Sequence, residues 1–212
     1  MKWEAKAPQF QGDVAAFAAQ RGLSPWEVWY APYDPSVYAF VLEHLKPEDV
    51  VLDIGAGDFR LAVAAARRVR KVYAVEVHPT LVADFLHRMG AGLPPNLQVI
   101  CANALDFPFP HDVTTGILLV RHSEHFAVFF SRLQAVGAQR LFTNARWHMG
   151  VELVDLQAPR MSLDAAPPGW YACACGAVGF KEPPSWDDPW TEETVHEVAT
   201  CPRCRASKEQ SR

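Results

Sequence analysis

The stretch Val50-Val-Leu-Asp-Ile-Gly-Ala-Gly57 decides the fold of this chain. Its valine, leucine and isoleucine residues predict a buried strand that runs into a tight turn. Glycine at positions 55 and 57 lets the turn bend sharply and lets a ligand approach its backbone closely. Residues 59–69 then follow a helical pattern. A strand, a glycine turn and a helix in this order are typical of ligand-binding α/β proteins.

Further strands and helices alternate on both sides of this stretch. Strands are expected at 49–54, 71–77, 96–101, 113–120 and 139–144, and helices at 35–46, 59–69, 79–89 and 122–136. This alternation implies right-handed crossovers and a mostly parallel sheet with helices on both faces, which is a Rossmann-like α/β fold. The segments 149–156 and 169–173 are expected to add a final hairpin at one edge of this sheet.

Composition divides the chain of 212 residues into four segments. The expected parts are an N-terminal helical and aromatic segment (1–33), the α/β domain (34–170), an extension rich in cysteine, proline and tryptophan (171–206), and a disordered tail (207–212). The length suits one α/β domain with a small appendage.

The charge balance and the apolar runs limit the expected partners and location. A net charge of −4 argues against a surface that grips nucleic acid, because such surfaces are usually basic. The dense basic run at 67–71 is interpreted as a helix C-terminus, where cations are favourable, rather than as an RNA contact. No secretory signal and no apolar run of membrane-spanning length occur, so we expect a cytoplasmic protein without a membrane partner.

Two carboxylates and a polar loop accompany the glycine turn. Asp53 stands near the strand end, where its charge suits the amino group of a positively charged cofactor. Glu76 ends the next strand, 19 residues beyond Gly57, where a carboxylate accepts hydrogen bonds from both ribose hydroxyls. Asn103 follows the third strand and is expected to meet an adenine amino group. A nicotinamide or flavin dinucleotide is the rival ligand, although Arg60 stands where its G-x-G-x-x-G pattern needs glycine. A fold that has kept this turn without a cofactor is a further alternative.

These motifs resemble the seven-strand, class I methyltransferases that depend on S-adenosylmethionine (SAM), over roughly residues 30–160. The resemblance implies SAM as cofactor. The cofactor-binding residues that it implies are Asp53, Gly55, Ala56, Gly57, Glu76, Val77, Asn103 and Ala104. Within this superfamily, Tyr30-Ala-Pro-Tyr33-Asp-Pro and Gly55-Ala-Gly-Asp-Phe-Arg60 are similar to the small protein-lysine methyltransferases. Those enzymes carry glycine where this chain has Phe59, which is expected to narrow the methionine end of the pocket.

The methyl acceptor is expected beside the loop that follows the fourth strand. The [D/N]-P-P-[Y/F] motif of enzymes that methylate exocyclic amines is absent there, since the chain reads Leu118-Leu-Val-Arg121-His122-Ser-Glu124-His125. The Pro-Cys motif of cytosine-C5 enzymes is also absent, and Cys101 is expected to be a small core residue. Candidate catalytic residues are Tyr33, His122 and Asn144. The polar residues after the fourth strand are alternatively the solvated first turn of a helix.

Four cysteines form two close pairs near the C-terminus. Cys173 and Cys175 make a C-x-C pair, and after 25 intervening residues Cys201 and Cys204 make a C-x2-C pair. Four thiolates in two such pairs suit a tetrahedral structural zinc, with His196 as a substitute ligand. The alternatives are a redox role of the second pair, a disulfide, or a chance arrangement of cysteines.

Two tryptophans, Trp186 and Trp190, lie in the loop between the cysteine pairs. They suit either a protein interface or packing against the main domain.

The sequence therefore predicts a SAM-dependent methyltransferase with a zinc-ribbon-like extension. A protein side chain is favoured as acceptor over RNA or a small molecule. One alternative is a catalytically weak or inactive methyltransferase-fold subunit that acts as a scaffold through its zinc ribbon. Another alternative is an RNA methyltransferase.

Overall fold

A computed structural model describes residues 35–120, 123–146, 150–185, 187 and 191–209, together with Ala16 and Ala19. Apart from these two alanines, the N-terminal segment 1–33 lies outside the described residues. Among the residues that are described, no helix is long and apolar enough to cross a lipid bilayer.

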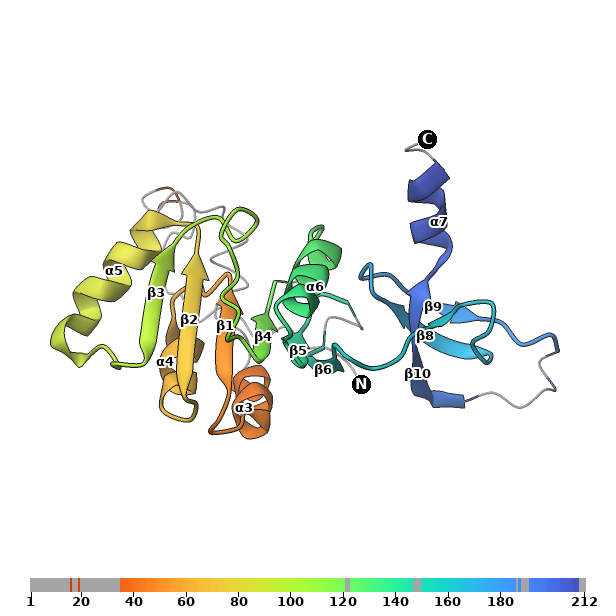
Figure 1. The fold of residues 1–212 in the computed structure, drawn as a ribbon, viewed down its shortest axis with the longest axis horizontal. Helices are drawn as coiled ribbons and strands as arrows, with labels where there is room; N and C mark the ends of the chain where they lie inside the picture. The colour runs from red at the N-terminus through yellow and green to blue at the C-terminus, as the bar shows by residue number, and fades with distance from the viewer. Residues whose placement is uncertain are drawn as a thin grey trace. The chain divides into compact units, whose positions relative to one another are not determined.

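Six strands form the main sheet in the order β3-β2-β1-β4-β5-β6 (Figure 1). The strands are β1 (Val50–Ile54), β2 (Lys71–Glu76), β3 (Leu97–Cys101), β4 (Thr115–Leu118), β5 (Arg140–Thr143) and β6 (Glu152–Asp155). β2 and β3, β1 and β4, and β4 and β5 pair in parallel, whereas β6 pairs with β5 in the antiparallel direction. The predicted α/β fold with a mostly parallel sheet is confirmed.

The described helices that accompany the main sheet are α3 (Pro35–His44), α4 (Arg60–Ala66), α5 (Pro79–Met89) and α6 (Phe126–Ala135), with a short 3-10 helix η1 (Gly90–Gly92) after α5. Two of these helices, α3 and α5, begin at a proline of the sequence. α5 has Pro79 in its first turn, where the missing N–H costs nothing, and it stops before Gly90 at φ 49°. α5 therefore covers the residues that the sequence predicts.

Of the described residues, 35–48 and 55–107 belong to one compact unit. In this unit α4 and α5 both pack against β2 and β3, and α3 packs against α4. The strand β2 is buried along five of its six residues. This packing holds the carboxyl end of β2 next to the glycine turn.

The second unit contains Asp49–Ile54 and the chain from Pro108 onward. α6 buries the stripe Phe126, Phe129, Phe130 and Leu133 that its helical spacing predicts. A Cβ atom on Gly116 of β4 would lie 2.6 Å from a methyl group of Leu133, so glycine permits the close approach of helix and strand.

Buried Asp49 ties the amino ends of β1, β4 and β5 together. It accepts hydrogen bonds from the hydroxyls of Thr114 and Thr115 at 3.2 and 3.0 Å. Arg140 forms an ion pair with the same carboxylate at 2.6 Å. Because Asp49 is only 4% exposed, this cluster is a buried polar anchor of the sheet.

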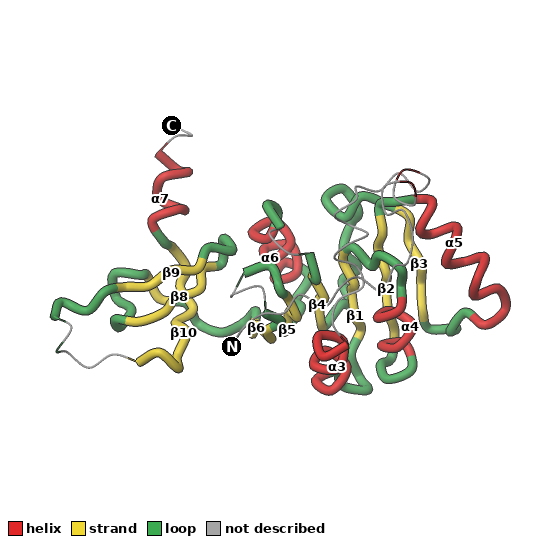
Figure 2. The backbone as a smooth tube through the Cα atoms, turned by 180° about the vertical axis from the view of Figure 1, so that it is seen from behind, coloured by secondary structure: helices red, strands yellow, loops and turns green. Residues whose placement is uncertain are grey.

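A second sheet has four strands in the order β7-β10-β8-β9. The strands are β7 (Met161–Ser162), β8 (Gly169–Cys173), β9 (Val178–Lys181) and β10 (Thr191–Thr200), followed by helix α7 (Pro202–Glu209). β8, β9 and β10 lie side by side in both views (Figures 1 and 2). We call this second sheet with α7 the ribbon.

One expectation about the C-terminal part needs correction. Only β6 joins the edge of the main sheet, while β8 belongs to the ribbon because it pairs with β9 and β10. α7 ends at Glu209, and the expected tail at 207–212 stays a prediction. The boundary near residue 170 stays a prediction.

Candidate functional site

The glycine turn that follows β1 is held against β2 by backbone hydrogen bonds. The N–H groups of Gly55 and Ala56 donate to the carbonyl of Val75 at 2.9 and 3.0 Å. Gly55 and Gly57 have φ values of 74° and 59°, in the left-handed region that favours glycine. A Cβ atom on Gly57 would meet nothing within 4 Å. The turn therefore needs glycine for its backbone conformation and presents open space beside Gly57.

Glu76 organises this turn from the end of β2. Its Oε2 accepts the N–H of Gly57 at 2.8 Å, and its Oε1 accepts the N–H of His78 at 2.9 Å. The side chain is almost fully buried, and each carboxylate oxygen has a second lone pair. Glu76 thus shapes the turn and keeps capacity to accept further hydrogen bonds, and its role as a ribose ligand stays a prediction.

Two other predicted cofactor contacts lie at strand ends. Asp53 occupies the second-last position of β1 and is 4% exposed. Val77 directly follows β2 and is 52% exposed. An apolar side chain left in solvent at the carboxyl end of a parallel strand is suited to lie against the face of a base, because ligands of such sheets bind there.

The side chain of Asn103 is engaged in its own turn. Its Oδ1 accepts the N–H of Leu105 at 3.0 Å, and its Nδ2 donates to Asp106 at 3.0 Å. An adenine amino group would have to share Oδ1 with the backbone. The cofactor roles of Asn103 and Ala104 stay predictions.

Phe59 adopts a conformation that the sequence did not indicate. Its φ is 65°, and it is the one non-glycine residue with positive φ in the described part of the chain. The side chain is fully buried and stacks on Phe85 of α5, with ring centroids 4.5 Å apart. The ring therefore packs against α5 in the core and is not exposed.

Of the three candidate catalytic residues, the structure describes only Asn144. Tyr33 and His122 lie outside the described residues. Asn144 follows β5 and is 1% exposed. Neither its Nδ2 nor its Oδ1 has a hydrogen-bond partner among the described residues, so the amide keeps its full capacity to bind a polar group.

The expectation that Cys101 is a core residue is wrong. Cys101 ends β3, which is the edge strand of the sheet, and its side chain is exposed. An edge position leaves one side of a strand uncovered, which a pattern of apolar residues alone does not reveal.

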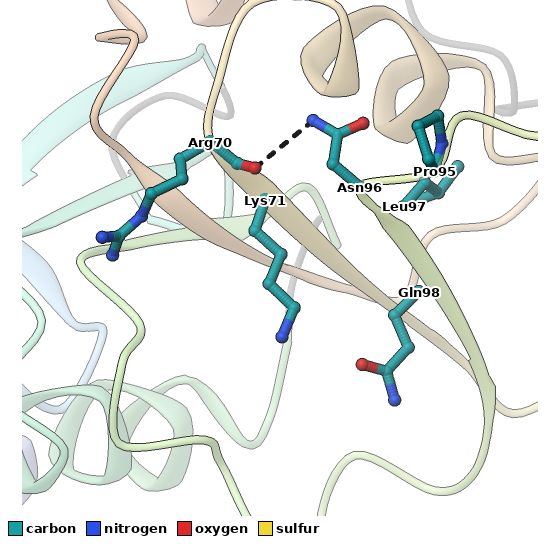
Figure 3. Close-up of a pocket in the computed structure, with 6 residues that line it drawn as sticks. All are labelled: Arg70, Lys71, Pro95, Asn96, Leu97 and Gln98. Carbon is teal, nitrogen blue, oxygen red and sulfur yellow. Dashed lines mark hydrogen bonds between the residues drawn. The ribbon is translucent and has the colours of Figure 1, made fainter.

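A hollow of about 420 Å³ lies at the opposite ends of β2 and β3 from Glu76 (Figure 3). It is lined by Arg70, Lys71, Pro95, Asn96, Leu97 and Gln98. The amide of Asn96 donates to the carbonyls of Ala66 and Val69 at 2.8 and 3.0 Å and so fastens the loop after α4. This hollow lies at the amino ends of the strands, away from the edge where such sheets bind ligands.

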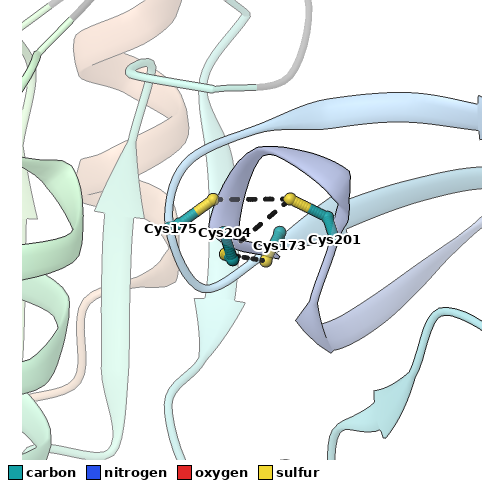
Figure 4. Close-up of side chains that lie close together, drawn as sticks. All are labelled: Cys173, Cys175, Cys201 and Cys204. Atoms are coloured by element: carbon teal, nitrogen blue, oxygen red, sulfur yellow. Dashed lines mark hydrogen bonds between the residues drawn. The ribbon is translucent and has the colours of Figure 1, made fainter. Parts of the chain in front are cut away.

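The four cysteines Cys173, Cys175, Cys201 and Cys204 come together in the ribbon (Figure 4). Their sulfur atoms all lie within 4.8 Å of one another, and three of the separations are 3.6, 3.7 and 3.8 Å. A tetrahedral zinc with Zn–S bonds of about 2.3 Å requires sulfur–sulfur separations of about 3.8 Å. A disulfide would need about 2.05 Å. The cluster therefore has the size of a tetrathiolate metal site.

The chemistry of the cluster also suits a cation. Burial raises the pKa of Cys173 and raises that of Cys175 to about 11. Burial alone would raise the pKa of Cys204 too, but hydrogen bonds from the Cys201 backbone and the other thiols lower it. Four thiolates cannot share this space without a compensating positive charge, and a divalent cation would provide it.

The ribbon has a small core of which the cysteines are part. Its buried residues are Ala166, Cys173, Val198 and Cys201. Small elements with so few buried residues usually need a metal or a disulfide to be stable. His196 is not in the sulfur cluster, and Trp186 and Trp190 lie outside the described residues.

The fold and the glycine turn define a class I SAM-dependent methyltransferase fold. Residues 33–145 match the model of the family "Ribosomal RNA adenine dimethylase". This match covers more than half of the chain, and the chain belongs to that family.

Proteins similar in sequence to this chain have names that agree with the family. A "Probable ribosomal RNA small subunit methyltransferase A" of Methanosarcina mazei is 44% identical over 66 residues, which are 31% of this chain and 24% of that protein. A "Probable dimethyladenosine transferase" of Drosophila melanogaster is 31% identical over 123 residues, which are 51% of this chain and 40% of that protein. The chain thus matches well under two thirds of the length of these relatives. A dimethyladenosine transferase structure from Plasmodium falciparum superposes with a TM-score of 0.46 and 18% identity, over 52% of this chain and 41% of that one.

These findings correct two expectations. The preference for a protein acceptor, with nucleic acid as the less favoured partner, is wrong, because the family and the relative from Methanosarcina mazei are named for ribosomal RNA. The similarity to protein-lysine methyltransferases is not supported either. The net charge of −4 misled because a sum over the chain does not report where basic residues gather.

Proposed function

We propose that this chain binds SAM at the glycine turn and transfers its methyl group to the N6 amino group of an adenine in ribosomal RNA. The observation that carries the proposal is the family match over 33–145, which includes the turn closed by Glu76 on Gly57. The proposal concerns the whole reaction, whereas the relatives are matched over only part of their length.

Bound SAM would supply an electrophilic methyl group. Glu76 would accept hydrogen bonds from the two ribose hydroxyls, and Asp53 would bear on the positively charged amino group of the methionine part. Val77 would lie against the adenine ring. Methyl transfer to an amine mainly requires alignment of the nitrogen with the carbon–sulfur bond, so positioning groups matter more than a strong base.

Asn144 is the proposed acceptor-side residue. A buried amide without partners costs about 1–3 kcal/mol, and such a cost is typical of groups that await a ligand. Its Oδ1 would accept a hydrogen bond from the amino group that is methylated, which would point the nitrogen lone pair away from Oδ1. This role would replace part of the absent [D/N]-P-P-[Y/F] motif.

We also propose that Cys173, Cys175, Cys201 and Cys204 bind one structural zinc ion. The sulfur separations and the cysteine content of the ribbon core support this proposal. The ion would join β8, β10 and α7 at a single point. Metal content per chain, measured on protein purified without chelator, tests this assignment.

The acceptor is tested with labelled SAM in one reaction that contains both ribosomal RNA and total protein. The RNA should come from cells that lack adenine dimethylation, so that the acceptor position is free. The proposal predicts label that ribonuclease releases and protease does not, recovered as N6-methylated adenosine. Label only in protein would contradict it, and SAM binding without any transfer would favour the inactive subunit.

A further inference from the structure

Arg146 is a buried cation between the main sheet and the ribbon. Its side chain is only 1% exposed. On one side it donates to both oxygens of Glu152 in β6, at 2.8 and 3.1 Å. On the other side it donates to both oxygens of Glu197 in β10, one of them at 3.1 Å. Burial alone would lower the pKa of Arg146, but these two carboxylates raise it above its usual value.

Glu197 connects this cation to the cysteine cluster. β10 runs beside β8 in parallel, with Glu197 opposite Ala172 and Val198 opposite Cys173. Cys201 follows Glu197 by four residues. A metal that joins Cys173 to Cys201 and Cys204 would therefore fix both strands at the position from which Glu197 reaches Arg146.

The other end of the connection is the acceptor edge of the main sheet. Asn144 directly follows the carboxyl end of β5, and Arg146 lies two residues further along the chain. A second contact also links the cysteine cluster to the main sheet. Gly176, in the turn between the first cysteine pair and β9, packs on Phe126. A Cβ atom on Gly176 would lie 3.1 Å from the Phe126 ring. Phe126 is the first residue of α6, the helix that follows the loop after β4.

We propose that Arg146 is a positioning residue that transmits metal occupancy of the cysteine cluster, through Glu197, to Asn144 at the acceptor edge. This inference rests on the proposed zinc site and on the proposed role of Asn144. Loss of the metal releases β10, Glu197 then no longer holds the guanidinium, and the segment Asn144–Arg146 loses its fixed position. None of the described contacts named above involves the turn at Gly55–Gly57, whose hydrogen bonds to Val75 and Glu76 should therefore persist.

The experiment compares hydrogen exchange of zinc-loaded and chelated protein, after metal content has been measured. In the wild-type chain, chelation should speed exchange about tenfold in residues 140–146 and 126–130. Exchange in β2 (Lys71–Glu76) should not change. The variants compared are Glu197→Gln and Glu152→Gln, which each remove one negative charge from the Arg146 guanidinium. Glu197→Gln also removes the ion pair of Glu197 with Arg160 at 3.3 Å, so Arg160→Gln is the control for that contact.

The two variants separate transmission from simple stability. In Glu197→Gln, residues 140–146 should exchange rapidly with or without zinc, because the connection from the ribbon is broken. In Glu152→Gln, the response to zinc should persist. Methyl transfer by Glu197→Gln should fall about tenfold in kcat while its Kd for SAM stays within about twofold of wild type.

Several results would overturn the inference. One is a wild-type chain in which chelation opens 169–176 but leaves 140–146 unchanged, and another is a Glu197→Gln variant that responds to zinc like wild type. A purified chain without bound metal would remove the zinc site and this inference together. Failure of SAM binding alone would instead refute the proposed methyl transfer and leave the hydrogen-exchange test standing.

Discussion

At position 59, a glycine variant should be more stable than an alanine variant, which is the reverse of the usual order of stability. The ring is fully buried and stacked on Phe85, so its removal should cost about 3–5 kcal/mol of unfolding free energy. Phe59 also has φ at 65°, a left-handed conformation that costs a residue with a Cβ about 1–2 kcal/mol. Phe59→Ala keeps this strain, whereas Phe59→Gly relieves it and loses about 0.5–1 kcal/mol through the flexibility of the unfolded chain. The glycine variant should therefore be more stable than the alanine variant by roughly 0.5–1 kcal/mol.

Urea unfolding followed by circular dichroism measures this difference. With a slope of about 2–3 kcal/mol per molar urea, the two midpoints should differ by about 0.3 M. The control is the same pair of substitutions at Phe85, a buried residue inside α5, where alanine should be more stable than glycine by about 1 kcal/mol. If Phe59→Ala is as stable as Phe59→Gly or more stable, the left-handed conformation of Phe59 is refuted.

Three further predictions concern the turn, the sheet and the ribbon. Glu76→Gln should weaken SAM binding about 10- to 100-fold in calorimetry, because an amide NH2 must then face the N–H of Gly57 or His78, and exposed Glu48→Gln should have no effect. Asp49→Ala should lower the unfolding free energy by about 3 kcal/mol, because it leaves the guanidinium of Arg140 without its carboxylate partner. The control Asp58→Ala breaks an exposed ion pair and should lower the unfolding free energy by less than about 1 kcal/mol. Equal losses in the two variants would argue against the buried anchor. Chelation of zinc should lower the unfolding temperature of the ribbon, measured as hydrogen exchange of residues 169–181, and should leave the unfolding temperature of β2 and β3 unchanged. A ribbon that stays protected from exchange without metal would contradict the structural zinc.

The parts of the fold that local patterns determine could be predicted from the sequence. The strand before the glycine turn follows from an apolar run and two glycines. α5 follows from Pro79 in its first turn and Gly90 after its end. The partners of β8 could not be predicted, because hydrogen bonding to β9 and β10 depends on contacts across the ribbon that no local pattern encodes.

In the candidate site, too, the features that depend on local spacing could be predicted, and those that depend on distant contacts could not. The turn and Glu76 follow from spacing along two adjacent strands. The cysteine cluster follows from its two close pairs, although its topology does not. The ion pairs of Arg146 were missed, because Glu197 is 51 residues away in the sequence and no spacing rule links them. The sequence analysis kept an RNA methyltransferase only as an alternative, because net charge was given more weight than it can carry.

Transfer of labelled methyl groups from SAM to ribosomal RNA that lacks adenine dimethylation tests the central claim most directly. The account predicts N6-methylated adenosine in the digested RNA with the wild-type chain and a strong reduction with Glu76→Gln. Unlabelled RNA, from a chain that is folded, loaded with zinc and shown by calorimetry to bind SAM, would contradict it.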